Sequence, residues 1–134
     1  MLIKVSVVPQ RFPKKEINDW SNKDHLIYFS NRYKDLTTHS FDIPIDAWVG
    51  MMSRMKGFRS KLHLDNIRYK TFIDNVFNVF FTQANYVPTF GAITSEKVYY
   101  VTNKLLKNRS CSNTEFEQLR NQLYSSDLFK KLGD

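Results

Sequence analysis

The stretch DNIRYKTFIDNVFNVF, residues 65–80, carries the most regular hydrophobic pattern in the chain. Large apolar side chains recur there every three or four residues: Tyr69, Phe72, Ile73, Val76, Phe77 and Phe80. Because this spacing places them on one face of an α-helix, and mostly polar residues lie between them, the stretch predicts an amphipathic helix. Asp65 can cap its first turn by accepting a backbone N–H. We therefore expect this helix to form the centre of the core.

Two further stretches, one on each side, also show helical spacing. Pro44 suits the first turn of a helix, and the apolar residues after it recur every three or four positions: Ile45, Trp48, Val49, Met52 and Met55. Gly57 is the expected end of that helix, because glycine is favoured just beyond a helix terminus. Residues 95–108 predict another helix, whose inward residues would be Val98, Val101 and Leu105.

The C-terminal residues predict two shorter helices. Ser112 and Glu115 match the S-x-x-E capping box at the start of residues 112–124, in which hydroxyl and carboxylate each accept a backbone N–H. SSDLFKKL, residues 125–132, predicts a last helix that ends at Gly133. NYVPTFGAI, residues 85–93, is expected to be a loop because proline and glycine both interrupt regular structure.

The N-terminal residues are less regular. LIKVSVV, residues 2–8, alternates weakly and predicts a strand. Pro13 could open a short helical turn that buries Ile17 and Trp20. HLIYFS, residues 25–30, fits a strand or part of a helix equally well, and the polar residues 31–40 predict a loop.

The expected fold is mainly α: a compact helical bundle with a small β element at the N-terminus. We expect one domain, residues 1–134, in which an irregular segment at 1–43 precedes a helical core at 44–132. The single cysteine, Cys111, cannot form an internal disulfide and fits a reducing compartment. No apolar run reaches the ~18 residues of a membrane span, and the N-terminus lacks a signal-peptide pattern. We expect a soluble, cytoplasmic protein, located in the host cytoplasm if the source is a virus.

The net charge of +7 is concentrated in the middle of the chain. Residues 1–50 carry seven basic and six acidic side chains, residues 51–110 ten and three, and residues 111–134 three and four. Such concentration is typical of a site for nucleic acid or another polyanion. Its first part would be the basic residues between 53 and 70, with a single acid among them: Arg54, Lys56, Arg59, Lys61, Arg68 and Lys70. If two antiparallel helices meet here, these side chains would crowd together at one end of the bundle.

Helix dipoles explain only part of this first basic set. Arg54 and Lys56 suit the C-terminal end of the helix expected to end at Gly57, where cations are favourable. Arg68 and Lys70 lie near a helix N-terminus, where positive charge is mildly unfavourable. An external anion would offset that cost.

A second basic set lies in the helix expected at 95–108. Four of its residues fall on one outward face, with Arg109 close behind: Lys97, Tyr100, Lys104 and Lys107. A tyrosine among lysines can stack on an exposed base while the lysines contact phosphates. The alternative is an ordinary solvated face, on which long basic side chains cover apolar surface.

The sequence carries no recognisable catalytic, nucleotide-binding or zinc motif. The three histidines are far apart and there is one cysteine, which excludes a standard structural zinc set. We expect a protein that is not an enzyme and uses no cofactor or metal.

Three stretches carry a resemblance to a known family: LIYFSN at Leu26–Asn31, DAWVG at Asp46–Gly50 and KLLKNRSCSNTEFEQLRNQL at Lys104–Leu123. In order and approximate spacing they are similar to the T-even-type phage helicase-assembly (helicase-loader) proteins. The resemblance implies a basic helical protein that binds branched or single-stranded DNA and contacts replication proteins. It assigns no individual functional residue.

The expected function is non-enzymatic nucleic-acid binding, as in a phage-type DNA replication or recombination accessory, with DNA favoured over RNA. One alternative is an inhibitor or adapter that docks its basic surface on an acidic protein. Another is a viral structural protein.

Overall fold

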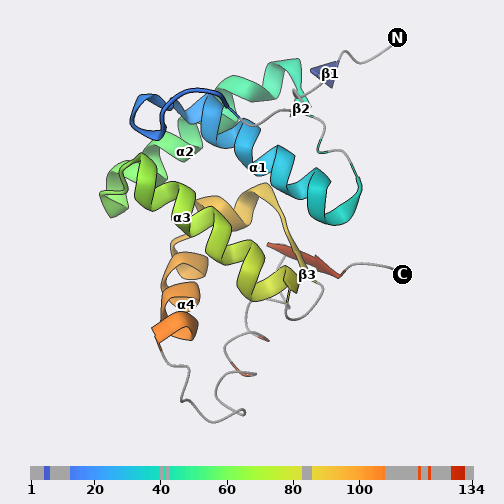
Figure 1. The fold of residues 1–134 in the computed structure, drawn as a ribbon, viewed down its shortest axis with the longest axis vertical. Coiled ribbons are helices and arrows are strands. Elements are labelled where there is room, and N and C mark those ends of the chain that lie inside the picture. The colour runs from blue at the N-terminus through green and yellow to red at the C-terminus, as the bar shows by residue number, and fades with distance from the viewer. Residues whose placement is uncertain are drawn as a thin grey trace. The chain divides into compact units, whose positions relative to one another are not determined.

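The computed structural model describes residues 5–6, 13–39, 41, 43–82, 86–107, 118, 121 and 128–131. Over these residues the protein is mainly α-helical, with four α-helices and two short two-stranded sheets (Figure 1), so the expected fold class is confirmed. The chain divides into two compact units, Met1–Lys70 and Thr71–Asp134. In the described part of the chain, no helix is long and apolar enough to cross a membrane.

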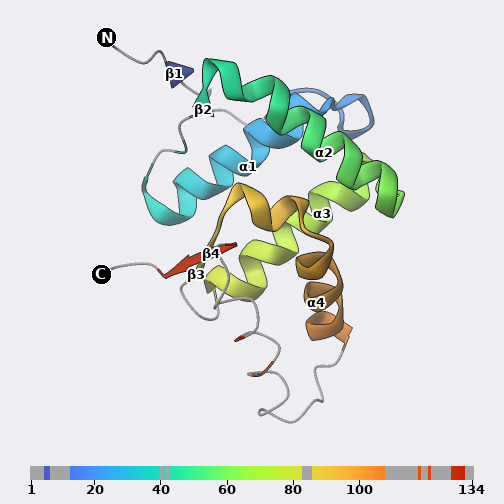
Figure 2. The ribbon, with the colours of Figure 1, turned by 180° about the vertical axis from the view of Figure 1, so that it is seen from behind.

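The N-terminal unit contains α1 (Asn22–Thr37) and α2 (Trp48–Leu62), which pack side by side in both Figure 1 and Figure 2. The strand β1 (Val5–Ser6) pairs antiparallel with β2 (Ile43–Pro44), and this pairing confirms the small N-terminal β element. Short 3₁₀ turns precede the two helices: η1 (Ile17–Asp19) and η2 (Ile45–Ala47). The prediction that Pro44 opens a helix is therefore wrong, because Pro44 belongs to β2.

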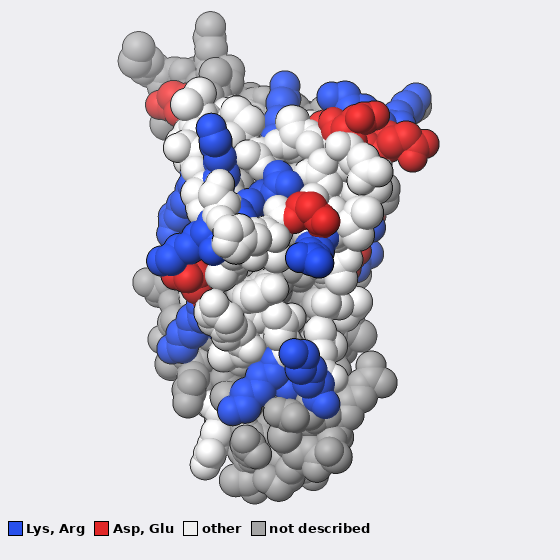
Figure 3. All heavy atoms as spheres, turned by 90° about the vertical axis from the view of Figure 1, so that its left-hand side faces the viewer, with Lys and Arg blue, Asp and Glu red and all other residues white. Residues whose placement is uncertain are grey.

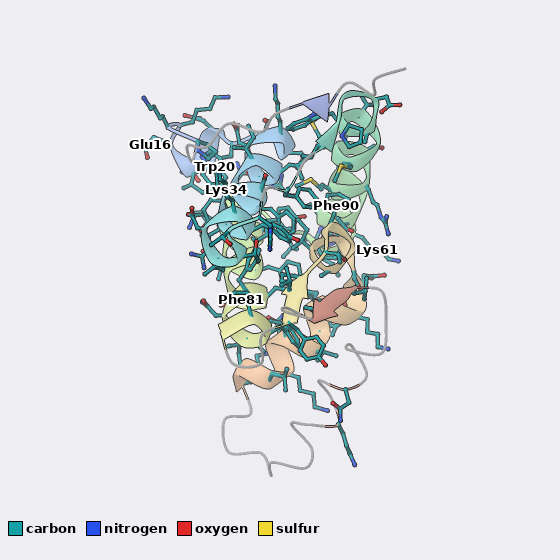
Figure 4. All side chains as sticks on the ribbon, turned by 90° about the vertical axis from the view of Figure 1, so that its right-hand side faces the viewer. Glu16, Trp20, Lys34, Lys61, Phe81 and Phe90 are labelled. Carbon is teal, nitrogen blue, oxygen red and sulfur yellow. The ribbon has the colours of Figure 1, made fainter. Side chains whose placement is uncertain are left out.

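The start of α1 is held by a capping box. The backbone N–H of Ser21 donates to Asp24 Oδ2 at 2.9 Å, and the Ser21 hydroxyl lies 3.1 Å from the same oxygen. Just before it, Trp20 is buried while Ile17 is half-buried, so the prediction for this turn is confirmed only for Trp20. Figure 4 shows Trp20 among other side chains, whereas Glu16 extends outward.

Residues 25–30 form part of α1, which resolves the choice between strand and helix. The loop predicted for residues 31–40 is wrong over 31–37, because α1 continues to Thr37. Two polar side chains there bond to carbonyls one turn back instead of breaking the helix. Asn31 Nδ2 donates to Ile27 O at 2.7 Å, and the Thr37 hydroxyl donates to Tyr33 O at 2.7 Å.

Gly57 does not end α2, contrary to the prediction from sequence. The helix continues to Leu62 and ends where His63 adopts a left-handed backbone with φ 53°. The reason is burial: Phe58 is 6% exposed and Met55 is fully buried, so the apolar face of the helix extends past the glycine. The backbone N–H of Leu64 closes the helix end by donating to Arg59 O at 3.0 Å.

Replacing Gly57 by alanine is expected to raise the free energy of unfolding by about 0.5–1 kcal/mol. Gly57 is exposed inside a helix, and a Cβ added there would meet no atom within 4 Å. Urea denaturation measures the change. Gly91→Ala is the control, because its Cβ would lie only 3.1 Å from Leu128 Cδ2 and should bring no gain. If Gly57→Ala leaves the free energy of unfolding unchanged, α2 is not a continuous helix at this point.

The helix α3 (Asn66–Val76) spans the division between the units, and a π-helical turn, η3 (Phe77–Thr82), follows it. The stripe predicted for this stretch is confirmed, since all of its members are buried: Tyr69, Phe72, Ile73, Val76, Phe77 and Phe80. The predicted cap is confirmed as well, because Asp65 Oδ1 accepts the backbone N–H of Arg68 at 2.8 Å.

The C-terminal unit continues with β3 (Tyr86–Pro88), η4 (Phe90–Thr94), α4 (Glu96–Lys107) and β4 (Phe129–Lys131). Figure 2 shows β3 beside β4, and they pair antiparallel with Val87 opposite Lys130. The helix predicted at 95–108 is confirmed, with Val98, Val101 and Leu105 buried.

Two predictions in this unit are wrong. Residues 86–88 form a strand and 90–94 a 3₁₀ turn, where a loop was expected, and residues 129–131 form a strand, where a helix was expected. The physical reason is the pairing itself: Thr89 N–H donates to Leu128 O at 2.9 Å, and the rings of Phe80 and Phe129 lie 4.5 Å apart. The helix predicted at 112–124, with Ser112 and Glu115, lies outside the described residues except for 118 and 121.

Candidate nucleic-acid interface

The outward face of α4 presents the second basic set as predicted. Its four members are exposed in the structure, with Tyr100 exposed by 59%: Lys97, Tyr100, Lys104 and Lys107. At 100° per residue they fall within an arc of about 80° on the helix, away from the buried Val98 and Leu105. Arg109, the fifth predicted member, lies outside the described residues. The helix therefore offers a face with lysines around an exposed tyrosine.

The tyrosine ring of this face is supported from behind. Tyr100 lies edge-on to Tyr99, with ring centroids 5.5 Å apart, and Tyr99 lies edge-on to Phe72 at 5.4 Å. These contacts hold an aromatic surface at the centre of the lysines. Figure 3 shows a group of Lys and Arg side chains in the lower part of the view, where α4 lies, with no Asp or Glu beside it among the described residues.

The first basic set lies in the N-terminal unit and does not gather on one face. Because α2 runs on past Gly57, Lys56 and Lys61 are separated by about 140° around the helix. Arg54 lies within about 20° of Lys61 around the helix. Figure 4 shows Lys61 extending outward. The expected crowding of all six side chains at one end assumed a helix that stopped at Gly57, and the observed helix distributes the cations around its surface.

Arg59 is the member of this set that the structure ties most firmly into the protein. Its guanidinium donates from Nε to Leu64 O at 3.2 Å, from Nη1 to Asn22 Oδ1 at 2.6 Å, and from Nη2 to Asn66 Oδ1 at 2.7 Å. It also lies 5.4 Å from the centre of the Tyr69 ring. Burial lowers the pKa of Arg59. Its first role is therefore to join α1, α2 and the first turn of α3.

Asn66 is the other half of this network, and no sequence pattern pointed to it. Its Nδ2 donates to Asn18 O at 3.2 Å and to Trp20 O at 3.0 Å. These two bonds fix the orientation of the amide, so that Oδ1 accepts from Arg59 and from His25 Nε2, the latter at 2.9 Å. Sequence reasoning missed both Asn66 and His25 because the hydrogen bond between them joins residues 41 positions apart, which no local pattern can indicate.

His25 is fully buried in the N-terminal unit. Since its Nε2 carries the proton donated to Asn66, its Nδ1 is an acceptor. That atom has no hydrogen-bond partner among the residues that the structure describes. The ring packs edge-on against Trp20 at 5.1 Å and Tyr69 at 5.0 Å. Burial lowers the pKa of His25 to about 4, and the charge of Arg59 acts in the same direction.

The remaining predicted residues lie at the start of α3. Arg68 is exposed, and Lys70 is half-buried with its Nζ 4.7 Å from the centre of the Tyr28 ring. That contact is a cation–π interaction, which offsets part of the cost of a cation in this half-buried position.

An open hollow of about 450 Å³, here called the α2–α3 hollow, lies in the N-terminal unit. Its described lining is Asn22, Lys56, Arg59, Ser60, His63, Leu64 and Asp65. Of these, Lys56 and Arg59 belong to the predicted basic set.

Within the described residues, no group of three or more His, Cys, Asp or Glu side chains could hold a metal ion.

In comparisons with known proteins, no family model matches this chain, and neither a curated protein nor a solved structure matches it at a significant level. Membership of the helicase-loader family therefore stays a prediction from the three sequence stretches that suggested it.

Proposed function

We propose that the protein binds nucleic acid without catalysing a reaction and that the outward face of α4 is its main contact surface. The observation that carries the proposal is the placement of exposed lysines around the exposed, ring-supported Tyr100. Lysines at this spacing can follow a phosphate backbone, and a tyrosine held between them can stack on an unpaired base. This combination favours a single-stranded region over a fully paired duplex.

The exposed cations of the N-terminal unit would add further phosphate contacts: Arg54, Lys56, Lys61 and Arg68. They lie on several sides of their helices, so they are better placed to contact a flexible single strand of nucleic acid than a rigid duplex. Together with the resemblance to helicase-assembly proteins, this supports a role as an accessory in phage-type DNA replication or recombination, with DNA as the expected partner.

The double variant Lys97→Ala/Lys107→Ala is expected to bind single-stranded DNA about 25-fold more weakly at 0.1 M salt. Each phosphate contact adds about 0.7 to the slope of log affinity against log salt for single strands, so the slope should fall by about 1.4. Fluorescence anisotropy of a labelled oligonucleotide, titrated at several salt concentrations, measures both quantities.

The matched control is Lys14→Ala/Lys23→Ala, which removes the same charge from two exposed lysines of the N-terminal unit. It should leave the affinity within about twofold and the slope within about 0.3 of the unchanged protein. If both double variants weaken binding equally, net charge and not the α4 face determines affinity, and the proposal is wrong. Circular dichroism confirms that each variant is folded.

A second candidate function is docking on an acidic protein. It is favoured by Val49, which is 73% exposed on α2 and lies within about 20° of Lys56 around the helix, since interfaces combine apolar and charged groups.

Replacing Tyr100 distinguishes the two candidate functions. Stacking on a base contributes about 1–3 kcal/mol, so for single-stranded DNA Tyr100→Ala should weaken binding at least fivefold while Tyr100→Phe retains it. No DNA binding by the intact protein at 0.1 M salt would favour the protein partner.

A further inference from the structure

The α2–α3 hollow collects hydrogen-bond donors and positive charge. Lys56 and Arg59 lie one turn apart on α2, and Ser60 and His63, whose side chains can both form hydrogen bonds, line the same space. The one acid in the described lining is Asp65, whose Oδ1 already accepts the backbone N–H of Arg68. The balance of formal charge in the hollow is therefore positive.

The charge of Arg59 is held in place but not neutralised by its hydrogen bonds. The three acceptors of these bonds, which are the Leu64 carbonyl and the side-chain oxygens of Asn22 and Asn66, are all neutral. A guanidinium has five N–H groups, so these three bonds leave donors that can face the hollow. An arginine fixed in this way loses little conformational entropy when it binds an anion.

Three helix ends also lie at the hollow. Both α1 and α3 begin next to it, at Asn22 and Asn66, and helix N-termini carry partial positive charge. The opposite end of α2 also lies there, but the N–H groups of His63 and Leu64 already bond to its last carbonyls. The starts of α1 and α3 are capped as well, by the carboxylates of Asp24 and Asp65, so the positive charge of the hollow rests on Lys56 and Arg59.

We propose that the α2–α3 hollow binds a phosphate monoester. At neutral pH such a group carries a charge of about −1.5 to −2 and three acceptor oxygens, which matches Lys56, Arg59 and the hydroxyl of Ser60. A phosphodiester carries one charge, and the nucleic-acid chain continues from it in both directions, so it suits an extended surface better than a hollow. The volume of about 450 Å³ lies within the range of about 300–1,000 Å³ usual for small-molecule sites.

This inference does not depend on the α4 face. A phosphate monoester can be the terminal phosphate of a nucleic-acid strand or part of a free phosphorylated molecule such as a nucleotide. The proposal would hold for the second source even if the protein bound no nucleic acid.

The test is binding of adenosine 5′-monophosphate, with adenosine as the uncharged comparison, measured by calorimetry and by backbone-amide NMR shifts at low salt. We expect saturable binding of the monophosphate, shifts at residues around the hollow, and no binding of adenosine. Absence of saturable binding, or equal binding of both compounds, would overturn the proposal.

Lys56→Met and Lys61→Met form a matched pair for this test. Both side chains are exposed on α2, so both variants should fold, but only Lys56 lines the hollow. Lys56→Met should weaken binding of the monophosphate on the order of tenfold, and Lys61→Met should change it less than twofold. Ser60→Ala is a second variant, expected to weaken binding several-fold. Equal effects of the two methionine variants would contradict a site in the hollow.

Two otherwise identical oligonucleotides, one with a 5′-phosphate and one with a 5′-hydroxyl, identify the source of the phosphate. Tighter binding of the phosphorylated strand, lost in Lys56→Met, supports recognition of strand ends. Equal binding of the two strands, with the monophosphate still bound, supports a free phosphorylated molecule. Monophosphate binding without any oligonucleotide binding would contradict the proposed function and leave this inference supported, whereas the reverse result would contradict only this inference.

Discussion

Replacing Asn66 by alanine is expected to lower the free energy of unfolding by about 3 kcal/mol, because one side chain makes four hydrogen bonds there. The variant leaves the Trp20 and Asn18 carbonyls without their donor and removes the acceptor shared by Arg59 and His25. Loss of a partner for a half-buried charge is the most costly part. Urea denaturation at pH 7.5, where His25 is neutral, measures the change.

Asn75→Ala is the matched control, since Asn75 is a half-buried asparagine in the same helix. Its replacement should change the stability by less than about 0.5 kcal/mol. Asn66→Asp should give an intermediate loss, because a carboxylate still accepts from Arg59 but cannot donate to the two carbonyls. If Asn66→Ala is no more harmful than Asn75→Ala, the network does not stabilise the N-terminal unit.

The protein is expected to lose about 2 kcal/mol of stability between pH 7.5 and pH 5 through His25 alone. Burial lowers the pKa of His25 to about 4 in the folded protein, whereas an unfolded chain protonates histidine near 6.5. As the pH falls below 6.5 the unfolded state therefore binds a proton that the folded state does not, and stability declines until the pH reaches about 4. Urea denaturation at half-unit pH intervals measures the decline.

His25→Gln removes the titrating group while keeping a side chain that can donate to Asn66. This variant should be less stable at pH 7.5 but show a flatter pH dependence between 7.5 and 5. The other charged groups that act on His25 are Arg59, Asp24 and Lys70. Asp24 does not interfere in this range, because its pKa lies below its ordinary value and it titrates at more acidic pH. If the free energy of unfolding falls equally steeply with pH in His25→Gln and in the unchanged protein, His25 does not determine the acid sensitivity.

The α4 face illustrates what local pattern can determine. Helix 95–108 was predicted from residues three and four positions apart, and the same periodicity that buries Val98 and Leu105 leaves Lys97 and Lys107 exposed. The cap at Asp65 was predictable for a similar reason, because donor and acceptor are three residues apart.

The strands of the C-terminal unit illustrate the opposite case. Neither Tyr86–Pro88 nor Phe129–Lys131 has a strong strand pattern, and each forms because the other is beside it. The partners are separated by about forty residues, so no window of sequence contains the hydrogen bonds that decide between loop, helix and strand.

From the sequence one can predict the mainly α fold, the buried stripe of α3 and the basic, tyrosine-centred face of α4, because spacing, capping and charge are properties of neighbouring residues. The role of Arg59 cannot be predicted in this way. As one of six cations in a short stretch it has the pattern of a surface contact for phosphate. In the folded protein Asn22, 37 residues away, and Asn66 hold its guanidinium in place beside a polar hollow. Whether an arginine meets solvent or a protein acceptor depends on which distant residues the fold brings within about 3 Å of it.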